Sequence, residues 1–391
     1  MSGRVYLDWN ATAPLRPEAR AAMLEAMDAV GNPSSVHAEG RAARAIVERA
    51  RGQVAGLVGC APDEVVFTSG ATEATQLADS DHVTVGADIE HDCVFENLLS
   101  EWRQRNAEAI SVDRAGRIDL AALGLQFDAN FGTHEPVTCI AVIAAQNETG
   151  VIQDVGGVVG IATDRTPSRC SATEVLCDAV QLVGRMPFHF ADSGVTFALL
   201  SGHKLGGPKG AGALVAKHGV PGENYLRRPL KGSQEMGLRG GTENVVGIAG
   251  FGAAAEAAAR DLEAGLWERV AHLRNILESA LEDVASDLII FGREAPRLPN
   301  TSCFAVPGWK GETQVMQLDL AGLAVSAGSA CSSGKVRESR VLRAMGFDAI
   351  TASSAIRVSL GPTTTEAEIR AFVEAWTGLY RKRRARLGDA A

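Results

Sequence analysis

The chain has 391 residues, of which 46% are hydrophobic, enough for two globular domains or for one large domain with a smaller companion. Its formal net charge is −9, whereas a protein that binds nucleic acid needs a basic surface, so no nucleic-acid partner is expected. It has no signal-like N-terminus and no apolar run near the ~18 residues of a membrane span, which predicts a cytoplasmic protein without a membrane partner.

Helix-forming and strand-forming segments alternate through the first half of the chain. A first helix is predicted to begin near Pro17, which suits the first turn of a helix, and a second covers 38–58 before Gly59. Short apolar runs predict strands at 65–68, 82–85, 137–144, 174–177, 195–201 and 211–216. Apolar strands separated by helices are typical of a mainly parallel sheet that is covered on both faces.

A long alanine-rich helical stretch over 245–285 ends this alternation. After it, the sequence predicts strands near 288–291, 301–306, 323–326 and 355–359, and a final helix over 365–387. This pattern indicates a second, α+β domain, which the N-terminal strand is expected to join. The predicted division is a large domain over 15–260 and a small domain formed by 1–14 and 261–391.

A lysine and an acid follow two neighbouring strands of the predicted sheet. Lys204 comes just after the strand 195–201, and Asp178 ends the strand 174–177, with Gln181 in the following turn. In pyridoxal phosphate enzymes a lysine condenses with the cofactor aldehyde, and a carboxylate keeps the ring nitrogen protonated so that the ring accepts electrons. The alternative is an ordinary turn with a solvated lysine and with Asp178 as a helix cap.

The segment 69–73 follows the strand 65–68 and opens a helix. Backbone N–H groups, the positive end of the helix dipole and two hydroxyls meet there, as at a phosphate site. The alternative is a capping box that serves only the helix. Ser201 and His203 add donors beside Lys204, so both segments are expected to hold one phosphate.

Three further polar residues occupy positions that favour ligand binding. His91 follows a strand-like run, and its imidazole can stack on a planar ring or move protons, although a lone histidine is more often structural. Asn147 ends the most apolar strand, where open α/β sheets bind their ligands, with simple turn chemistry as the alternative. Arg357 is a charge inside an apolar strand, which is costly unless it meets an anion such as a carboxylate.

Cys331 lies in the Gly/Ser-rich segment 325–334, whose composition is typical of a loop. An accessible thiol there becomes a nucleophile if nearby groups favour the thiolate; the alternative is an unreactive surface cysteine. The seven cysteines are scattered and form no Cys-x-x-Cys pair, so they are expected to be reduced. No stable metal site is predicted, with Cys331 at most a transient iron–sulfur ligand.

Four segments together resemble the cysteine desulfurases of the pyridoxal-phosphate-dependent class V aminotransferase family. They are 68–73, 201–204, 239–244 and 328–331. The resemblance runs nearly end to end, from Tyr6 to the strand of Arg357. It implies an α/β protein of PLP-dependent transferase fold type I, with a large domain built on a mainly parallel seven-stranded sheet and a smaller α+β domain.

The resemblance also implies a role for each candidate residue. Lys204 would hold pyridoxal 5′-phosphate, Asp178 would pair with its ring nitrogen, Gln181 would meet its hydroxyl, and His91 would stack on the ring. The phosphate would be bound by Ala71, Thr72, Ser201 and His203, together with Thr242 from the other subunit of a homodimer.

For the substrate, the resemblance implies that Arg357 and Asn147 bind the carboxylate of L-cysteine and that Cys331 takes its sulfur as a persulfide. L-Alanine would be released, and the sulfur would pass to an acceptor protein such as an iron–sulfur scaffold. One alternative is a selenocysteine lyase or another β-lyase, in which Cys331 would be dispensable. Another is a catalytically idle scaffold, suggested by the short segment 73–90.

Overall fold

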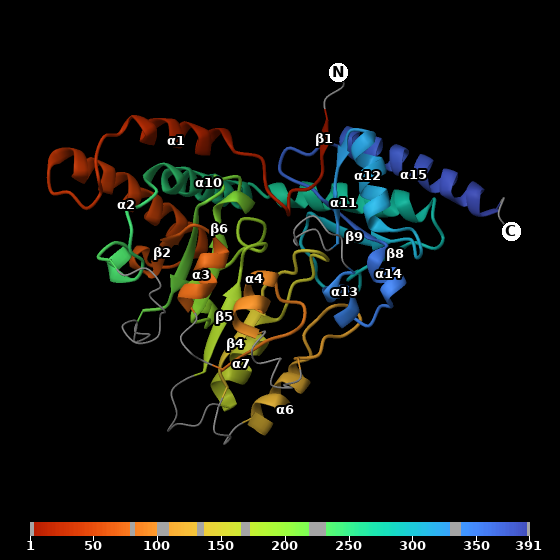
Figure 1. The fold of residues 1–391 in the computed structure, drawn as a ribbon, viewed down its shortest axis with the longest axis horizontal. Helices are drawn as coiled ribbons and strands as arrows, with labels where there is room; N and C mark the ends of the chain where they lie inside the picture. The colour runs from red at the N-terminus through yellow and green to blue at the C-terminus, as the bar shows by residue number, and fades with distance from the viewer. Residues whose placement is uncertain are drawn as a thin grey trace.

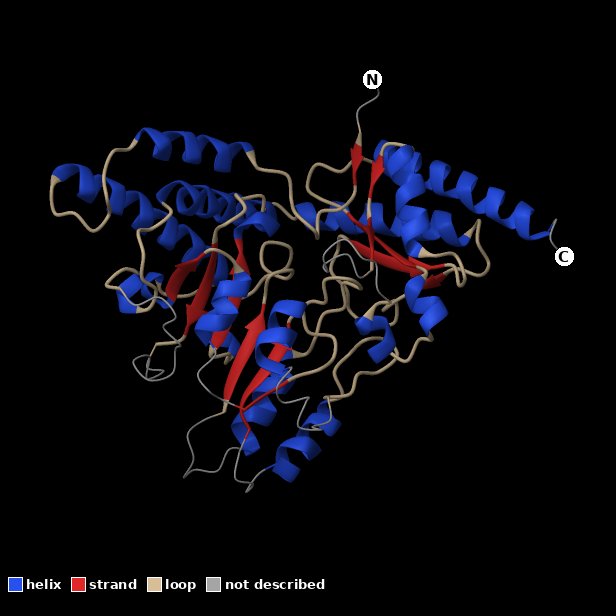
Figure 2. Cartoon of the chain, viewed as in Figure 1, coloured by secondary structure: helices blue, strands red, loops and turns tan. Residues whose placement is uncertain are grey.

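The computed structural model describes residues 4–78, 83–99, 109–130, 137–165, 173–218, 232–328 and 338–388. The described residues form a six-stranded first sheet, a four-stranded second sheet and a two-stranded sheet, accompanied by helices, and both termini lie on the side of the second sheet (Figure 1, Figure 2). None of the helices described is both long and apolar enough to cross a bilayer.

The first sheet has six strands in the described part of the chain. They are β2 (Val65–Thr68), β3 (Val83–Val85), β4 (Val137–Ile143), β5 (Glu174–Asp178), β6 (Phe197–Ser201) and β7 (Gly212–Ala216), in the order β2-β7-β6-β5-β4-β3. β7 runs antiparallel to both neighbours, and the other pairings are parallel. The expected α/β architecture is confirmed, as a mixed and largely parallel sheet, with six described strands where seven were expected.

Helices cover this sheet and bury its apolar strands. They are α1 (Pro17–Asp28), α2 (Ala38–Val58), α3 (Ala71–Ala78), α4 (Asp92–Val94), α6 (Leu120–Asn130), α7 (Val155–Arg165), α8 (Phe190–Ser193) and α10 (Val245–Glu263). α1, α2 and α10 pack together along one side, above the sheet in the view of Figure 1. α2 ends as predicted at Gly59, which adopts a left-handed φ of 64° that favours glycine.

The prediction of one helical stretch over 245–285 is wrong in one respect. α10 ends at Glu263, and α11 (Leu266–Glu282) begins after Gly265. Gly265 has a left-handed φ of 64°, which ends the helical conformation at this residue. The sequence did not reveal the break, because a glycine is also tolerated inside a helix.

The second sheet contains β8 (Ile289–Ile290), β9 (Thr301–Ala305), β11 (Ser326–Ala327) and β12 (Ala355–Ser359), in the antiparallel order β11-β12-β9-β8. The N-terminal strand β1 (Val5–Tyr6) forms a separate two-stranded parallel sheet with β10 (Leu323–Ala324), and Leu7 after it accepts from the backbone N–H of Ser359 in β12. The helices that follow α11 in this part of the chain are α12 (Gly311–Leu320), α13 (Arg340–Ala344), α14 (Ala349–Ser353) and α15 (Glu366–Gly388). The domain boundaries given above stay a prediction.

The first apolar core unites the central strands of the first sheet with α2 and α10, around side chains such as Phe251, and extends to Cys303 of β9 in the second sheet. In the second core the fully buried Trp376 of α15 stacks on Tyr380, with ring centroids 5.4 Å apart, and meets the edge of Phe304. The first core therefore packs the two sheets against each other.

A buried ion pair joins α2 to the turn that contains Glu235. Both guanidinium nitrogens of Arg51 donate to the Glu235 carboxylate, at 2.8 and 2.9 Å. The backbone N–H of Phe67 in β2 donates to the same carboxylate at 2.7 Å. Glu235 and Met236 have positive φ values of 44° and 57°, so these contacts hold a strained turn in place.

We therefore expect Glu235→Ala to lower the free energy of unfolding by about 3–5 kcal/mol, because it leaves the buried Arg51 without its partner. Glu366→Ala removes an exposed ion pair with Arg370 and should cost less than about 1 kcal/mol. Urea unfolding of both variants measures the difference. Equal, small losses in the two variants would contradict a structural role for the Arg51 pair.

Candidate active site

A cavity of about 640 Å³ opens at the carboxyl ends of the central strands. Ten of the twelve predicted site residues line it. They are Ala71, Thr72, His91, Asn147, Asp178, Gln181, Ser201, His203, Lys204 and Arg357. Thr242 is exposed in this chain and does not line the cavity. Cys331 lies outside the described residues.

Lys204 lies in the 3₁₀ turn Gly202–Lys204 that directly follows β6. Its Nζ donates to the backbone carbonyls of Asn10 at 2.7 Å and Ala11 at 2.8 Å. A Cβ at Gly202 would lie 3.0 Å from the carbonyl of Ala211, so a glycine allows this close packing behind the lysine. The amine is therefore fixed at the cavity wall by the N-terminal segment.

Asp178 and Glu90 form a pair of buried acids near the floor of the cavity. Burial raises the pKa of Asp178, while His91 and Lys204 act in the opposite direction. Glu90 accepts from the backbone N–H of Ile143 at 2.9 Å, and its second oxygen has no partner among the described groups. Burial, with some repulsion from Asp178, raises the pKa of Glu90 to about 8. The pair would be stabilised by a cation at Asp178.

The opposite end of the cavity has the features of an anion site. The first-turn amides of α3 have no partner within the helix, and Ala71 and Thr72 bring them to the wall. A Cβ at Gly70 would meet no atom within 4 Å, so this turn faces open space. Burial, followed by the charges of Lys204 and Lys209, lowers the pKa of His203 to about 4, which leaves its imidazole neutral.

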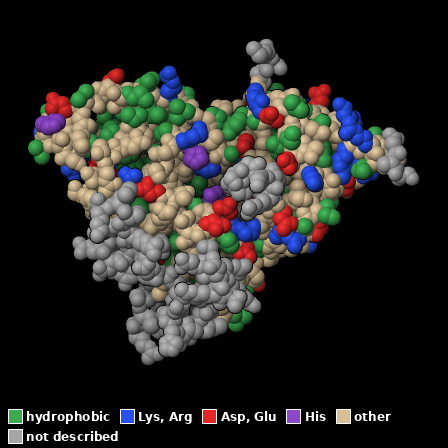
Figure 3. Space-filling view, viewed as in Figure 1, with side chains coloured by type: hydrophobic (Ala, Val, Ile, Leu, Met, Phe, Trp, Pro, Cys, Tyr) green, Lys and Arg blue, Asp and Glu red, His purple; other side chains and the backbone are tan. Residues whose placement is uncertain are grey.

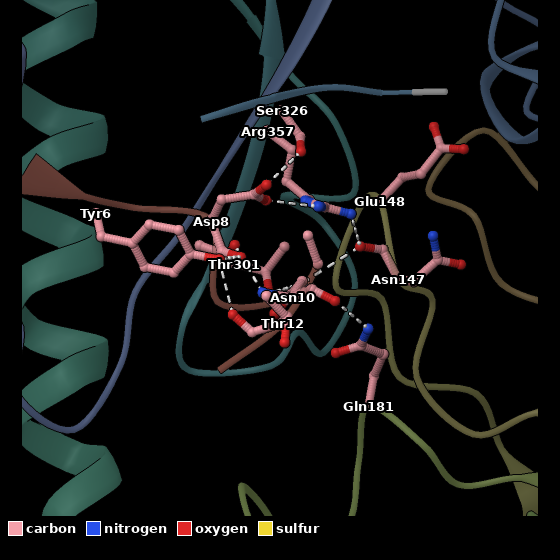
Figure 4. Close-up of polar contacts among 12 residues, drawn as sticks. Tyr6, Asp8, Asn10, Thr12, Asn147, Glu148, Gln181, Thr301, Ser326 and Arg357 are labelled. Atoms are coloured by element: carbon pink, nitrogen blue, oxygen red, sulfur yellow. Dashed lines mark hydrogen bonds and ion pairs between the residues drawn. The ribbon is translucent and has the colours of Figure 1, made fainter. Parts of the chain in front are cut away.

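Arg357 enters the cavity from β12 of the second sheet. It donates to the Asp8 carboxylate at 2.8 Å and to the backbone carbonyl of Asn147 at 2.9 Å (Figure 4). Its Nε is buried and has no partner among the described groups. The sequence predicted that this buried charge meets an anion. The carboxylate of Asp8, in the same chain, is such an anion.

The sequence analysis did not predict Asn10 of the cavity wall or Arg185, which lies outside the lining of the cavity. Asn10 is buried beside Lys204, and its side-chain amide donates to the Thr301 hydroxyl at 2.9 Å. Arg185 is buried and donates to the backbone carbonyls of Gln181 at 2.6 Å and Lys204 at 3.4 Å. Burial, with the charge of Arg357 adding to it, lowers the pKa of Arg185 to about 9. The one signal in the sequence that could have indicated Arg185 was the position of its charge, a few residues after Asp178.

His91 caps the short helix α4 and lines the cavity. Its Nδ1 accepts from the backbone N–H of Cys93 at 3.1 Å, and the Cys93 sulfur lies 3.0 Å from the same nitrogen. In the neutral ring the proton is therefore on Nε2. The short connection before His91 does not keep this side chain out of the site.

The comparisons with known proteins now identify the family. The model of the class V aminotransferases matches residues 5–372. The chain belongs to the class V aminotransferase family. The enzymes of this family depend on pyridoxal phosphate, so the family membership and the cavity point to the same cofactor.

Curated relatives resemble this class V aminotransferase over nearly its whole length. A cysteine desulfurase of Cereibacter sphaeroides is 39% identical over 95% of this chain and 94% of its own. A cysteine desulfurase of Frankia sp. (strain EuIK1) is 40% identical over 94% of this chain and 88% of its own. The solved structure of a NifS-like protein from Rickettsia africae superposes with a TM-score of 0.83 and 30% identity, over 97% of this chain and 99% of the other.

The residues of the cavity fit pyridoxal phosphate. An amine, a buried acid that needs a cation and a helix N-terminus lie around one space, as the aldehyde, ring nitrogen and phosphate require. The side-chain oxygen of Gln181 is buried and has no partner among the described groups, so it can accept from a ring hydroxyl. In the described part of the chain, no group of three or more metal-ligating side chains is placed to hold a metal ion.

The buried Glu90 predicts a pH dependence of stability in the cofactor-free protein. Its pKa of about 8 in the folded state lies above the ordinary 4.5, so the stability that it contributes is lost as pH rises through this window. Gln cannot ionise. As pH rises, the free energy of unfolding of Glu90→Gln should therefore increase relative to that of the wild type, by up to about 1.4 kcal/mol for each pH unit. Thermal unfolding from pH 4 to 9 measures this. Parallel curves for the two proteins would contradict it.

Proposed function

We propose that this protein is a cysteine desulfurase, which converts L-cysteine to L-alanine and transfers the sulfur to Cys331 as a persulfide. The observation that carries the proposal is that one cavity combines Lys204 and Asp178 with the guanidinium of Arg357. The curated relatives, up to 40% identical and named cysteine desulfurase, support it. They favour it over a selenocysteine lyase, another β-lyase or an idle scaffold.

The residues around the cavity divide the work of holding the cofactor. Lys204 would bind the aldehyde, Asp178 would keep the ring nitrogen protonated, and Gln181 would accept from the ring hydroxyl. His91 would lie against the ring face. Ala71, Thr72, Ser201 and His203 would bind the phosphate. When bound, pyridoxal phosphate supplies an electron sink for the bond that breaks at the substrate Cα.

The chain's own groups orient the substrate and move its protons. Arg357 binds the α-carboxylate, with Asn147 beside it. Lys204 Nζ takes the Cα proton, and its contacts with the backbone carbonyls of Asn10 and Ala11 support a defined place for the free amine in the cavity wall. In its neutral form, His91 carries its ring proton on Nε2, where it can donate to a substrate or cofactor oxygen.

The sulfur step uses Cys331 as the nucleophile. Its thiolate attacks the substrate sulfur, so that an S–S bond forms and the substrate C–S bond breaks with its electron pair going to carbon. The carbon skeleton takes up a proton at Cβ, regains its Cα proton from Lys204, and leaves as L-alanine. The persulfide then passes to a protein thiol, and we propose an iron–sulfur scaffold as one such acceptor. A cytoplasmic location remains a prediction of the sequence.

The test measures alanine and protein-bound persulfide from L-cysteine in Lys204→Ala and Cys331→Ser. Lys204→Ala should lose both products and the visible absorption of the bound cofactor. Cys331→Ser should keep the absorption but form no persulfide, and release alanine more than about a hundredfold more slowly. Full activity of Cys331→Ser towards cysteine would reject the persulfide route and favour a β-lyase.

We also propose that the protein is a homodimer in which Thr242 reaches the cavity of the other subunit. Thr242 is exposed and lies outside the cavity of its own chain. Exposed apolar side chains at the end of α1 and beyond it, Met27, Val30 and Val36, are suited to burial by a second copy. Figure 3 shows apolar side chains gathered over α1.

Subunit mixing tests this arrangement. Thr242→Ala should retain the cofactor less well, and Lys204→Ala should be inactive. A mixed dimer of the two contains one intact site, formed by Lys204 of one chain and Thr242 of the other, so activity should return on mixing. Sedimentation at micromolar concentration gives the oligomeric state. A monomeric active enzyme, or no recovery in a verified mixed dimer, would contradict the proposal.

A further inference from the structure

Arg340, the first residue of α13, binds the turn that leads into His91. Its guanidinium donates to the backbone carbonyl of Asp88 at 2.6 Å and to that of Glu90 at 2.8 Å. The Glu90 carbonyl belongs to the peptide bond that joins Glu90 to His91. Because a peptide bond is planar, holding this oxygen fixes the plane from which the His91 backbone starts.

The same guanidinium also holds the residues that follow His91. It donates to the Asp92 carboxylate at 3.0 Å, and it lies over the ring of Phe95, with the guanidinium carbon 3.9 Å from the ring centroid. A planar guanidinium can donate along its edge while it stacks on a ring, whereas a lysine ammonium is a single point charge. One guanidinium therefore binds backbone carbonyls before His91 and side chains after it.

Hydrogen bonds of the neighbouring residue hold the start of α13, and with it Arg340, in place. The neighbouring Ser339 caps α13 by accepting from the backbone N–H of Leu342 at 3.1 Å, and its hydroxyl donates to Glu148 at 2.6 Å. Glu148 is buried and follows Asn147 of the cavity wall. The start of α13 is thus tied to the carboxylate-binding side of the cavity, while the Arg340 side chain reaches the His91 side.

Arg340 acts at a distance from the reacting groups. It is not among the described residues that line the cavity, whereas His91 is. The imidazole is fixed to its own backbone, since Nδ1 accepts from the N–H of Cys93. Its place in the cavity therefore depends on the backbone of this turn, which Arg340 holds from outside.

We propose that Arg340 is a positioning residue, which holds the His91 imidazole where it meets the cofactor ring. The proposal deepens the proposed function and rests on it for its kinetic consequence. Its structural part, the place of His91 in the cavity, is independent of the substrate. Loss of the guanidinium releases the turn and lets His91 move, while Lys204 and Arg357 keep their own contacts.

A double-mutant cycle with His91→Ala in the holoenzyme tests the proposal. Arg340→Ala should lower kcat/KM for cysteine by roughly 10- to 100-fold and change the visible circular dichroism of the bound cofactor. In the His91→Ala background the same substitution should change neither quantity further, because the two residues act as one unit. Arg340→Lys should restore only part of each signal.

Arg343→Ala is the matched control. Arg343 lies one turn further along α13 and donates to the carbonyl of Phe347 at 2.7 Å, away from the His91 turn. It should leave kcat/KM and the dichroism unchanged. Thermal unfolding of each variant identifies any general loss of folding, and Arg340→Lys serves for the cycle if Arg340→Ala does not fold.

Two outcomes would overturn the proposal. One is an unchanged dichroism in a folded Arg340 variant, and the other is an effect of the same size with and without the His91 imidazole. A wild type that binds the cofactor but releases no alanine from cysteine would reject the proposed function instead. The dichroism cycle would still decide whether Arg340 positions His91.

Discussion

The segment Asp8–Thr12 joins the two sheets, and the arrangement of the cavity depends on it. Asp8 binds Arg357 of the second sheet, while the Asn10 carbonyl accepts from Lys204 at 2.7 Å and from the Gln181 side chain at 3.0 Å. These contacts bring the lysine that follows β6 and the arginine of β12 to one cavity. Figure 4 shows Asp8 beside Arg357 and Asn10 beside Gln181. Neither sheet alone could build the site.

Buried charge explains why this space suits one class of ligand. Asp178 and Glu90 are acids removed from water, and desolvation opposes their ionisation. A protonated ring nitrogen beside Asp178 would satisfy one of them, and the neutral form of the other adds no net charge. At the far end, α3 and the neutral His203 offer donors for a phosphate. A cofactor with a cationic ring and an anionic tail matches both ends.

Strand ends could be predicted from the sequence because local patterns determine them. The apolar runs that give β2, β4, β5 and β6 are continuous, and the polar residues after each of them reach the cavity, as the carboxyl ends of parallel strands must. Gly265 was missed since a glycine is compatible with either a helix interior or a break, and only its left-handed φ decides.

Residues whose partners are distant in the chain could not be predicted in this way. Asn10 meets Thr301, which lies 291 positions later, and no local pattern records such a contact. Arg185 and Arg340 likewise bind backbone carbonyls, which every residue possesses, so their partners leave no mark in the composition. The resemblance to a family supplied the roles of Lys204 and Asp178, but it gave nothing for these supporting residues.

The partnership of Asp8 with Arg357 also limits what the arginine can bind. The contacts with Asp8 and the Asn147 carbonyl use one N–H of each terminal nitrogen, and the buried Nε remains without a partner among the described groups. A guanidinium has five N–H donors in a fixed plane, so an α-carboxylate can bind the remaining donors without displacing Asp8. Since Asp8 already balances the positive charge in part, a second carboxylate on the substrate would meet repulsion. In its proposed role as the carboxylate-binding residue, Arg357 would therefore favour an amino acid with a single carboxylate, such as cysteine, over an acidic one.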